Sequence, residues 1–255
     1  MGLEVWITQD YDEMSDKAYE VVAHTNHTNP YAFHCFPTGR TPKGLKQRII
    51  RGYEREELDF SESGFIHCDE YVGLPDTHKQ SYAREIYEDF IRHLNFRPRN
   101  IYLIDGMSPK LDRYCLSIEE RISKFGGIDL CVLGIGPDAH IAFDMPGSSF
   151  DCRTRVTEIS EETRRANARF FDNNINLVPK HAITIGIATI MESKRVMLLA
   201  NGEHKADPIQ KALEGEITEQ VPASILQQHE DALFIIDRAA ASKLSLDFLK
   251  TCNFY

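Results

Sequence analysis

The sequence predicts an α/β protein in which helices cover both faces of a mostly parallel, doubly wound sheet, so that the fold has three layers. Along the chain, short apolar segments of strand length alternate with longer segments whose apolar residues recur at helical spacing. One short segment, 130–133, is apolar at every position and stops at a glycine, as a buried parallel strand does. With 255 residues and 42% hydrophobic residues, the chain is also long enough to bury a sizeable core.

In chain order, strands are predicted at 3–7, 31–36, 65–68, 101–104, 130–133, 182–187, 196–200 and 232–236, and helices at 11–24, 41–51, 81–94, 111–124 and 160–172. Two of the helix starts carry capping residues. Thr41 precedes Pro42, a good N-cap and N1 pair, and Ser160 opens the last of these helices. No repeat or linker interrupts the alternation, so residues 1–255 are predicted to form a single Rossmann-like domain.

Charge and composition exclude several classes of protein. The formal charge of -10 and the pI near 5.5 leave no basic face to neutralise the phosphates of a nucleic acid. The sequence contains neither a run of about 18 apolar residues nor a basic segment followed by an apolar one at its N-terminus, so we expect no membrane span and no signal peptide. We therefore expect a cytoplasmic protein with no nucleic-acid or membrane partner.

Cysteine and histidine spacing gives no sign of a cofactor. The six cysteines include no C-x-x-C pair, and the ten histidines show no H-E-x-x-H spacing. We expect reduced thiols and no metal site.

The loop that follows the strand at 130–133 is the centre of the predicted site. It carries Asp138 and His140, two positions apart, at the end of a strand where open α/β sheets bind their ligands. A carboxylate beside an imidazole holds it in one tautomer and lets it move protons near neutral pH. The loop is therefore predicted to be a reaction centre.

Two further loops have features of phosphate sites. The first contains Gly39 and the hydroxyls of Thr38 and Thr41 in front of a helix N-terminus, whose free N–H groups favour an anion. Taken alone, this pattern is more typical of an ordinary strand-to-helix turn. In the second loop Lys205 stands at a helix start, where a cation is unfavourable unless an anion lies between it and the helix.

Two other groups add candidates. Asp69 and Glu70 follow a predicted strand, and one of them is a candidate general base, although a solvated acidic turn is the alternative. Arg169 is one of three arginines in the predicted helix 160–172. A guanidinium binds phosphate in a bidentate manner, so Arg169 is a candidate phosphate ligand.

The candidate residues belong to five longer motifs: Pro37-Thr38-Gly39-x-Thr41-Pro42, Asp69-Glu70-Tyr71-Val72-Gly73-Leu74, Gly134-x-Gly136-x-Asp138-x-His140-Ile141-Ala142-Phe143, Arg169-Phe170-Phe171-Asp172-Asn173 and Gly202-x-x-Lys205-Ala206. In combination and in this order, these motifs resemble the glucosamine-6-phosphate deaminase family over nearly the whole chain. Related galactosamine-6-phosphate isomerases and 6-phosphogluconolactonases share weaker versions of this set.

The resemblance implies conversion of glucosamine 6-phosphate to fructose 6-phosphate and ammonia, with no metal or organic cofactor. It makes Asp69 the base that moves the proton between C2 and C1 of the open-chain sugar. It makes His140 the group that assists ring opening, with Asp138 supporting its orientation. The residues it assigns to the sugar phosphate are Thr38, Gly39, Thr41, Arg169 and Lys205.

One departure from the family pattern concerns the partner of the histidine. Met145 stands where the family usually has a glutamate that holds this imidazole, and a thioether carries no charge. His140 therefore loses a charged partner unless Asp144 or Asp138 replaces it. Restoring a glutamate at position 145 is then expected to raise turnover.

Two smaller departures lie in the loops. Arg40 stands where a second glycine is common, and its cation either adds a phosphate contact or crowds the loop. Ala139 replaces the usual glycine, which is tolerable if its φ is negative.

The alternatives are a homologue that binds a sugar phosphate with little turnover, and the specificity of a lactonase or a galactosamine-6-phosphate isomerase. Family members often form hexamers, so the resemblance also implies a homo-oligomer. Some bind N-acetylglucosamine 6-phosphate at a subunit interface. Ser148 and Arg155 match that site, but Thr157 stands where activated members have a lysine, which argues against activation.

Overall fold

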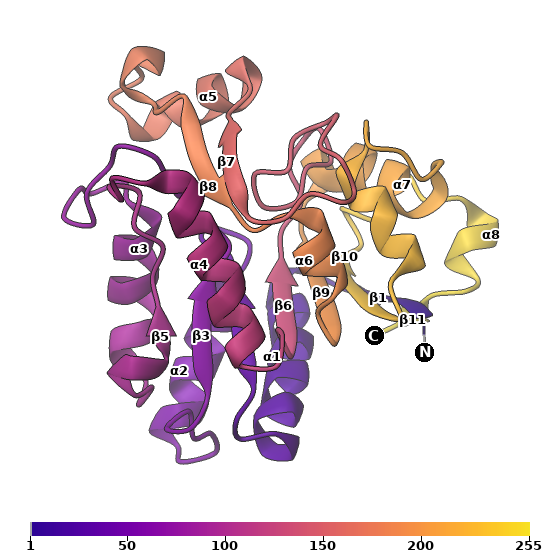
Figure 1. Cartoon of the computed structure of the whole chain (residues 1–255). Coiled ribbons are helices and arrows are strands. Elements are labelled where there is room, and N and C mark those ends of the chain that lie inside the picture. The colour runs from indigo at the N-terminus through magenta and orange to yellow at the C-terminus, as the bar shows by residue number, and fades with distance from the viewer. Residues whose placement is uncertain (1) are drawn as a thin grey trace.

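The computed structural model describes residues 2–255, and its main feature is an eight-stranded sheet in the order β11-β1-β10-β9-β6-β2-β3-β5 (Figure 1). The strands are β1 (Gly2–Thr8), β2 (Phe33–Phe36), β3 (Gly64–His67), β5 (Ile101–Tyr102), β6 (Leu130–Leu133), β9 (Arg195–Ala200), β10 (Asp231–Asp237) and β11 (Asn253–Phe254). Every neighbouring pair in this sheet is parallel. The predicted parallel sheet is confirmed.

Helices cover both faces of the sheet, because alternate residues of each central strand enter different cores. In β9, Val196 and Leu198 belong to one core, whereas Met197 and Leu199 belong to the other. The second core is closed by α1 (Tyr11–Thr28), α2 (Lys43–Glu54) and α3 (Tyr82–Asp89). The first is closed by α4 (Leu111–Lys124), α6 (Ile187–Met191), α7 (Ala206–Glu214) and α8 (Leu246–Leu249). This is the three-layer, doubly wound arrangement that the sequence predicts.

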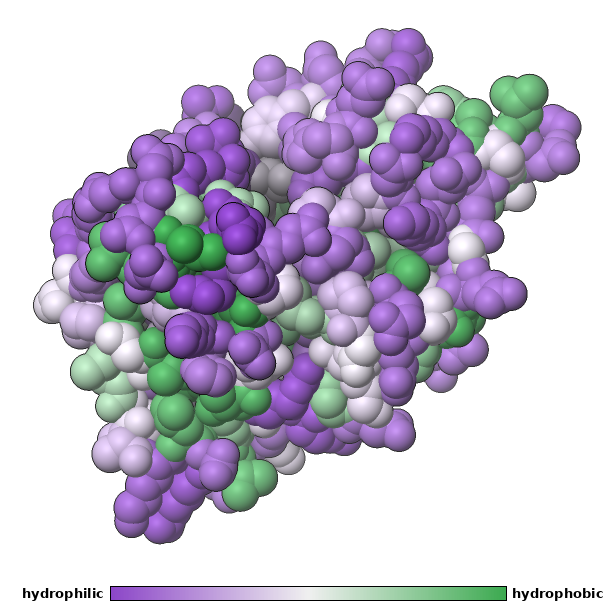
Figure 2. Space-filling model, turned by 90° about the horizontal axis from the view of Figure 1, so that it is seen from above, coloured by the Kyte–Doolittle hydropathy of each residue, from purple (hydrophilic) through white to green (hydrophobic). Residues whose placement is uncertain are grey.

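A second, three-stranded antiparallel sheet lies above the main sheet in Figure 1. Its strands are β4 (Asp69–Tyr71), β8 (His181–Thr184) and β7 (Arg155–Glu158), and α5 (Glu161–Asn167) follows β7. The surface seen from this side is largely hydrophilic (Figure 2). The sequence-based assignment is wrong here, because residues 69–71 are a strand rather than a loop and 181–184 pair outside the main sheet.

Several predicted boundaries also differ from the structure. The segment 81–94 is α3 followed by a 3₁₀ turn at Ile91–His93, and the helix predicted at 160–172 ends at Asn167. The other 3₁₀ turns are Pro98–Asn100, Ala168–Phe170, Ile175–Leu177, Glu203–Lys205 and Pro222–Gln228. Among residues 2–255, no helix combines the length and apolar character needed to cross a membrane.

The start of α2 corrects the predicted N-cap. The helix begins at Lys43, and no side chain caps it. The hydroxyl of Thr41 instead donates to Oδ1 of Asn201 at 3.1 Å, in the loop after β9. Thr41 therefore joins two loops at the same edge of the sheet rather than closing a helix end.

Candidate active site

The predicted site residues lie on loops that leave four neighbouring strands. The strands β9, β6, β2 and β3 are adjacent in the main sheet. Because they are parallel, their carboxyl ends lie at one edge, where open α/β sheets bind ligands. The loops that follow them carry Lys205, Asp138 with His140, Gly39 with its neighbouring threonines, and Asp69.

Asp138 and His140 form a close pair in the loop after β6. Oδ1 of Asp138 lies 2.5 Å from Nδ1 of His140. A carboxylate only accepts hydrogen bonds, so Nδ1 carries the proton and Nε2 is left as the free acceptor. Burial alone would raise the pKa of Asp138, but the hydrogen bond and charge of His140 outweigh it and the pKa is lowered. Asp138 therefore stays ionised and orients the imidazole.

The same loop holds two alanines in a left-handed conformation. Ala139 has φ 65° and Ala142 has φ 50°, so the condition stated for tolerating alanine at position 139, a negative φ, is not met. The carbonyl of Ala139 accepts a hydrogen bond from the N–H of Ala223 at 3.0 Å. A Cβ at Gly136 would collide with the imidazole of His140, which is why the chain needs a glycine there. The loop is thus held in a conformation that costs about 1–2 kcal/mol at each alanine.

Asp69 is the first residue of β4 and is 8% exposed. Its pKa is raised well above the ordinary value, first by burial and then by the charges of Glu70, Asp144 and Glu85. A carboxylate with a raised pKa accepts protons more readily at neutral pH. The surroundings of Asp69 therefore suit a general base.

Glu70, the next residue, binds the start of α3 through its carboxylate. Its carboxylate accepts hydrogen bonds from the hydroxyl of Ser81 at 2.7 Å and from the N–H groups of Tyr82 and Ala83 at 3.1 and 2.8 Å. These N–H groups belong to the first turn of α3, which has no intrahelical acceptor for them. Glu70 is therefore a helix cap, and the candidate base is Asp69.

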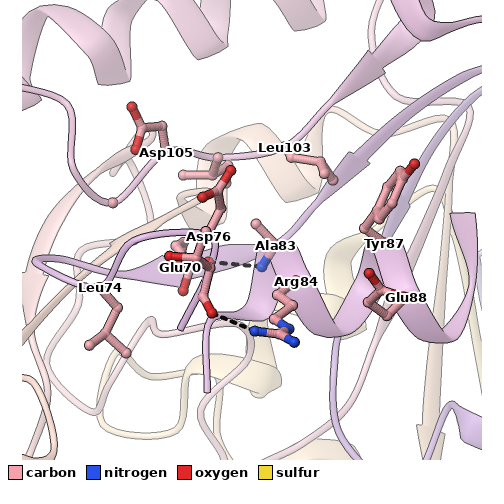
Figure 3. Close-up of a pocket in the computed structure, with 12 residues that line it drawn as sticks. Glu70, Leu74, Asp76, Ala83, Arg84, Tyr87, Glu88, Leu103 and Asp105 are labelled. Carbon is pink, nitrogen blue, oxygen red and sulfur yellow. Dashed lines mark hydrogen bonds between the residues drawn. The ribbon is translucent and has the colours of Figure 1, made fainter. Parts of the chain in front are cut away.

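A cavity of about 550 Å³ lies on the Glu70 side of β4, along the outer surface of α3 (Figure 3). Figure 3 shows the hydrogen bond between Glu70 and Ala83 beside it, and the second bond drawn joins Arg84 to the carbonyl of Thr77. Except for Glu70, none of the predicted site residues lines this cavity. It is separate from the candidate active site.

Asp144 is fully buried and forms an ion pair in which its Oδ1 lies 2.5 Å from Nη1 of Arg155. Its Oδ2 has no hydrogen-bond partner within residues 2–255. Burial raises the pKa of Asp144 to about 6, although the Arg155 charge opposes that shift. Asp144 is thus neutralised by Arg155 and is not the hydrogen-bond partner of His140.

This ion pair also ties the His140 loop to the small sheet. Thr184 of β8 lies opposite Asp69 on one side and opposite Arg155 on the other. Its hydroxyl accepts a hydrogen bond from the N–H of Phe143 at 3.0 Å. The loop that carries His140 and the sheet that carries Asp69 are therefore fixed relative to each other.

Met145 packs away from the imidazole. It is 8% exposed and belongs to a third apolar cluster with Tyr71, Phe143 and Phe171. Its Sδ lies 3.7 Å from the hydroxyl of Thr163. Because Asp138 already binds Nδ1 of His140, the methionine does not leave the imidazole without a charged partner.

Two of the predicted phosphate-binding cations lie near each other. Nζ of Lys205 donates to the carbonyl of Ile135 at 2.7 Å. Burial lowers the pKa of Lys205, the Asp138 charge opposes this shift, and the Arg169 charge lowers it further. Arg169 itself is exposed and lies over the ring of Phe170, 4.7 Å from its centroid. A cation whose charge is disfavoured in this way is stabilised by a bound anion.

The loop after β2 has one contact that the sequence did not predict. The N–H of Gly39 donates to Oε1 of Glu85 at 2.9 Å. Glu85 lies in α3, where an acidic residue in the first helical turn is ordinary, so no sequence signal marked it. Thr38 is half-buried, and Arg40 is exposed.

Residues 2–255 contain no group of three or more histidine, cysteine, aspartate or glutamate side chains arranged to hold a metal ion. All six cysteines are unpaired.

Comparison with known proteins gives consistent matches over most of the chain. Residues 10–235 match the family of glucosamine-6-phosphate isomerases and 6-phosphogluconolactonases. Glucosamine-6-phosphate deaminase 2 of Bacillus subtilis is 43% identical over 95% of this chain and 98% of its own length. Glucosamine-6-phosphate deaminase of Clostridioides difficile is 42% identical over 95% of this chain and 97% of its own length.

Solved structures agree with these matches. A structure described as a monomeric glucosamine-6-phosphate deaminase superposes with a TM-score of 0.90 at 39% identity, covering 95% of this chain and all of that one. The 6-phosphogluconolactonase of Thermotoga maritima gives a TM-score of 0.73 at 20% identity, covering 92% of this chain and all of that one, and shows the shared fold. The chain therefore belongs to the family of glucosamine-6-phosphate isomerases and 6-phosphogluconolactonases.

Proposed function

We propose that this protein is a glucosamine-6-phosphate deaminase, which converts glucosamine 6-phosphate to fructose 6-phosphate and ammonia. The observation that carries the proposal is the Asp138–His140 pair, 2.5 Å apart, at the same sheet edge as the buried Asp69. The relatives that bear this name are 42% and 43% identical over 95% of the chain, which supports it.

His140 opens the sugar ring. Asp138 holds the proton on Nδ1, so Nε2 takes the proton of the anomeric hydroxyl and returns one to the ring oxygen. The bond between C1 and the ring oxygen breaks, and C1 becomes the aldehyde carbon. The Asp138 carboxylate stabilises the imidazolium that exists between the two transfers.

Asp69 then moves a proton between carbons. Its carboxylate removes the proton from C2 of the open-chain aldehyde, and this proton is returned to C1. A proton passes from the amino nitrogen to O1, so that C1 becomes a CH2OH group and an imine is left at C2. Water adds to the imine, and ammonia leaves to give the ketone of fructose 6-phosphate. The raised pKa of Asp69 supports this role, because a stronger base takes a C–H proton more readily.

Cations hold the phosphate end of the substrate. Lys205 and Arg169 supply charge, and the Thr38–Thr41 segment supplies hydroxyl and N–H donors. Binding at the phosphate, far from C1 and C2, aligns the reacting carbons with Asp69 and His140.

The test is formation of fructose 6-phosphate and ammonia in equal amounts from glucosamine 6-phosphate. Galactosamine 6-phosphate and 6-phosphogluconolactone are assayed beside it. Ammonia from the glucosamine compound is the expected result. Hydrolysis of the lactone without ammonia release from either amino sugar would contradict the proposal, as would binding of the sugar phosphate with no turnover.

We further propose that residues 1–255 act as one unit, because loops from both halves of the chain supply the site. The homo-oligomer implied by the resemblance remains a prediction, and the similar deaminase structure is described as monomeric. Light scattering on the purified chain decides between a monomer and an oligomer.

A further inference from the structure

A carboxylate occupies one of the N–H groups proposed to bind the substrate phosphate. Oε1 of Glu85 accepts the hydrogen bond of the Gly39 N–H at 2.9 Å. Gly39 has φ 93°, a conformation that favours glycine, in the loop between β2 and α2. An N–H exposed in this way is a typical phosphate ligand, and here it is bound by an anion from the protein itself.

The charge of Glu85 also affects the pKa values of neighbouring groups. Its charge helps to raise the pKa of Asp69 on β4 and of Tyr82 on its own helix. The charges of Glu85 and Asp89 also raise the pKa of Lys46 in α2, opposing the effect of its burial. Glu85 is therefore bonded to the loop after β2, and its charge acts on the candidate base Asp69.

Lys46 is a buried cation whose charge these carboxylates stabilise. It is 4% exposed and forms no ion pair within 4.0 Å among residues 2–255. Burial lowers its pKa to about 8, and the charges of Glu85 and Asp89 oppose that shift. A buried ammonium gains stability when a carboxylate approaches it.

We propose that Glu85 is an affinity-determining residue that competes with the substrate phosphate for the Gly39 N–H. This inference rests on the proposed function, since it assumes that the loop after β2 receives the phosphate of an amino-sugar phosphate. The chain then holds its substrate more weakly than its cations allow, because binding must first break a charge-assisted hydrogen bond.

Two substitutions separate competition from simple charge repulsion. Glu85→Ala removes the acceptor and the charge, whereas Glu85→Gln keeps a neutral acceptor of the same length. We expect Glu85→Ala to lower the Kd for fructose 6-phosphate by about tenfold, and Glu85→Gln by less. Glu88→Gln is the matched control, because Glu88 lies in the same helix but is exposed and pairs with Arg92.

Calorimetric titration with fructose 6-phosphate and with inorganic phosphate measures these constants. Tighter binding of both compounds by Glu85→Ala, with no change in Glu88→Gln, supports the proposal. Unchanged or weaker binding by both Glu85 variants overturns it, since Glu85 would then be a support of the loop rather than a competitor. Thermal unfolding of each variant verifies that it is folded.

The pH profile provides a readout that a purely structural role would not move. The Glu85 charge helps to raise the pKa of Asp69, so its removal lowers that pKa. If Asp69 is the base, activity rises as its proton is lost, and the acid limb of kcat/KM should move to lower pH in Glu85→Gln. The Glu85 charge also raises the pKa of Tyr82 and opposes the lowering of the pKa of Lys46. A limb that stays in place in Glu85→Gln contradicts the link to Asp69.

Failure of this inference is distinct from failure of the proposed function. A wild-type protein that releases no ammonia refutes the function, while the titrations with inorganic phosphate still measure competition at the loop. A wild-type protein that releases ammonia, with equal Kd values in all variants, refutes only the role of Glu85.

Discussion

Asp69 and Asp138 are carboxylates at the same edge of the sheet, yet their surroundings shift their pKa values in opposite directions. Burial raises the pKa of Asp69, whereas in Asp138 the hydrogen bond of His140 overcomes the effect of burial. Groups whose environments separate their pKa values in this way commonly divide acid–base work between them. Here the difference favours the proposed roles, in which Asp69 transfers the proton and Asp138 orients the imidazole.

Asp69→Asn should therefore remove most turnover and leave binding of the phosphorylated sugar nearly unchanged. The amide has the same shape but cannot take the C2 proton, and general-base catalysis contributes about 10²- to 10⁴-fold. Exchange of the C2 proton with solvent deuterium, followed by NMR, measures the step directly. Exchange at the wild-type rate in the variant would exclude Asp69 as the base.

Met145→Glu is expected to destabilise the chain without raising turnover, contrary to the expectation from the sequence. The new carboxylate would lie among Tyr71, Phe143 and Phe171, with the Thr163 hydroxyl as its polar neighbour. Burying a charge in such a cluster is unfavourable, and we expect the substitution to lower the unfolding free energy by about 2–4 kcal/mol. Met145→Leu, a swap of similar volume, should cost less than about 1.5 kcal/mol. A folded Met145→Glu protein with higher kcat at any pH would show this interpretation to be wrong.

The sequence proposed Asp69, Asp138 and His140 as candidates because each follows a strand of the main sheet, where polar side chains are conspicuous. It did not identify Glu85, since acidic residues near a helix start are common and usually solvated. Position after a strand alone also left open whether Asp69 or Glu70 is the base; the family resemblance favoured Asp69. Neighbouring residues of a strand point to opposite sides, and which side faces the site depends on the pairing of β4 with β8.

The first turn of α3 depends on a carboxylate from another element. Glu70→Ala removes the acceptor for the Ser81 hydroxyl and for two N–H groups of this turn. We expect a loss of about 2–3 kcal/mol in unfolding free energy, because buried donors are left unsatisfied. Urea unfolding measures it, with Asp76→Asn, an exposed residue beside the same cavity, as the control. A loss of turnover in Glu70→Ala without loss of stability would point instead to a catalytic role.

The loop after β6 stores strain at Ala139. Ala139→Gly should raise the unfolding free energy by up to about 1 kcal/mol, because glycine adopts a positive φ without the steric cost that alanine bears. Ala188→Gly, inside α6, should lower it by about 1 kcal/mol. Thermal unfolding of the two variants compares them. Equal destabilisation by both would mean that the left-handed conformation at 139 carries no cost.

The buried Asp144 makes the stability of the whole molecule depend on pH. Its pKa is about 6 in the folded chain, whereas the ordinary value of 3.8 applies to the unfolded chain. The folded state therefore binds this proton more tightly than the unfolded state does. Its contribution to stability is therefore largest below pH 4 and is lost as the pH rises through 6, by about 3 kcal/mol in total. Asp144→Asn should lack this decline. Urea unfolding from pH 4 to 7 tests it, with Asp247→Asn, an exposed residue, as the control. Parallel curves for wild type and Asp144→Asn would contradict the assignment.

The main sheet was predictable because its strands are short apolar runs between amphipathic helices, as in β6 and β9. The small sheet was not, because β4 has three residues, and two of them are acidic. Strand β7 is polar and half-exposed, so it lacks the alternation that marks a strand. Both strands form because β8 lies between them, and pairing between distant segments leaves no local pattern.

The pairing of β1 with β10 determines how late in synthesis the main sheet can be completed. The hydroxyl of Thr8 donates to the carbonyl of Ile236, 228 residues later in the sequence. During synthesis β1 is therefore complete long before β10 leaves the ribosome. Until then, the backbone N–H and C=O groups of β1 that pair with β10 lack this partner. Lys205, on the loop that completes the site, also emerges late. A nascent chain is thus inactive until nearly all of it has been translated, and recovery of activity on refolding reports the last long-range pairing rather than the first helices.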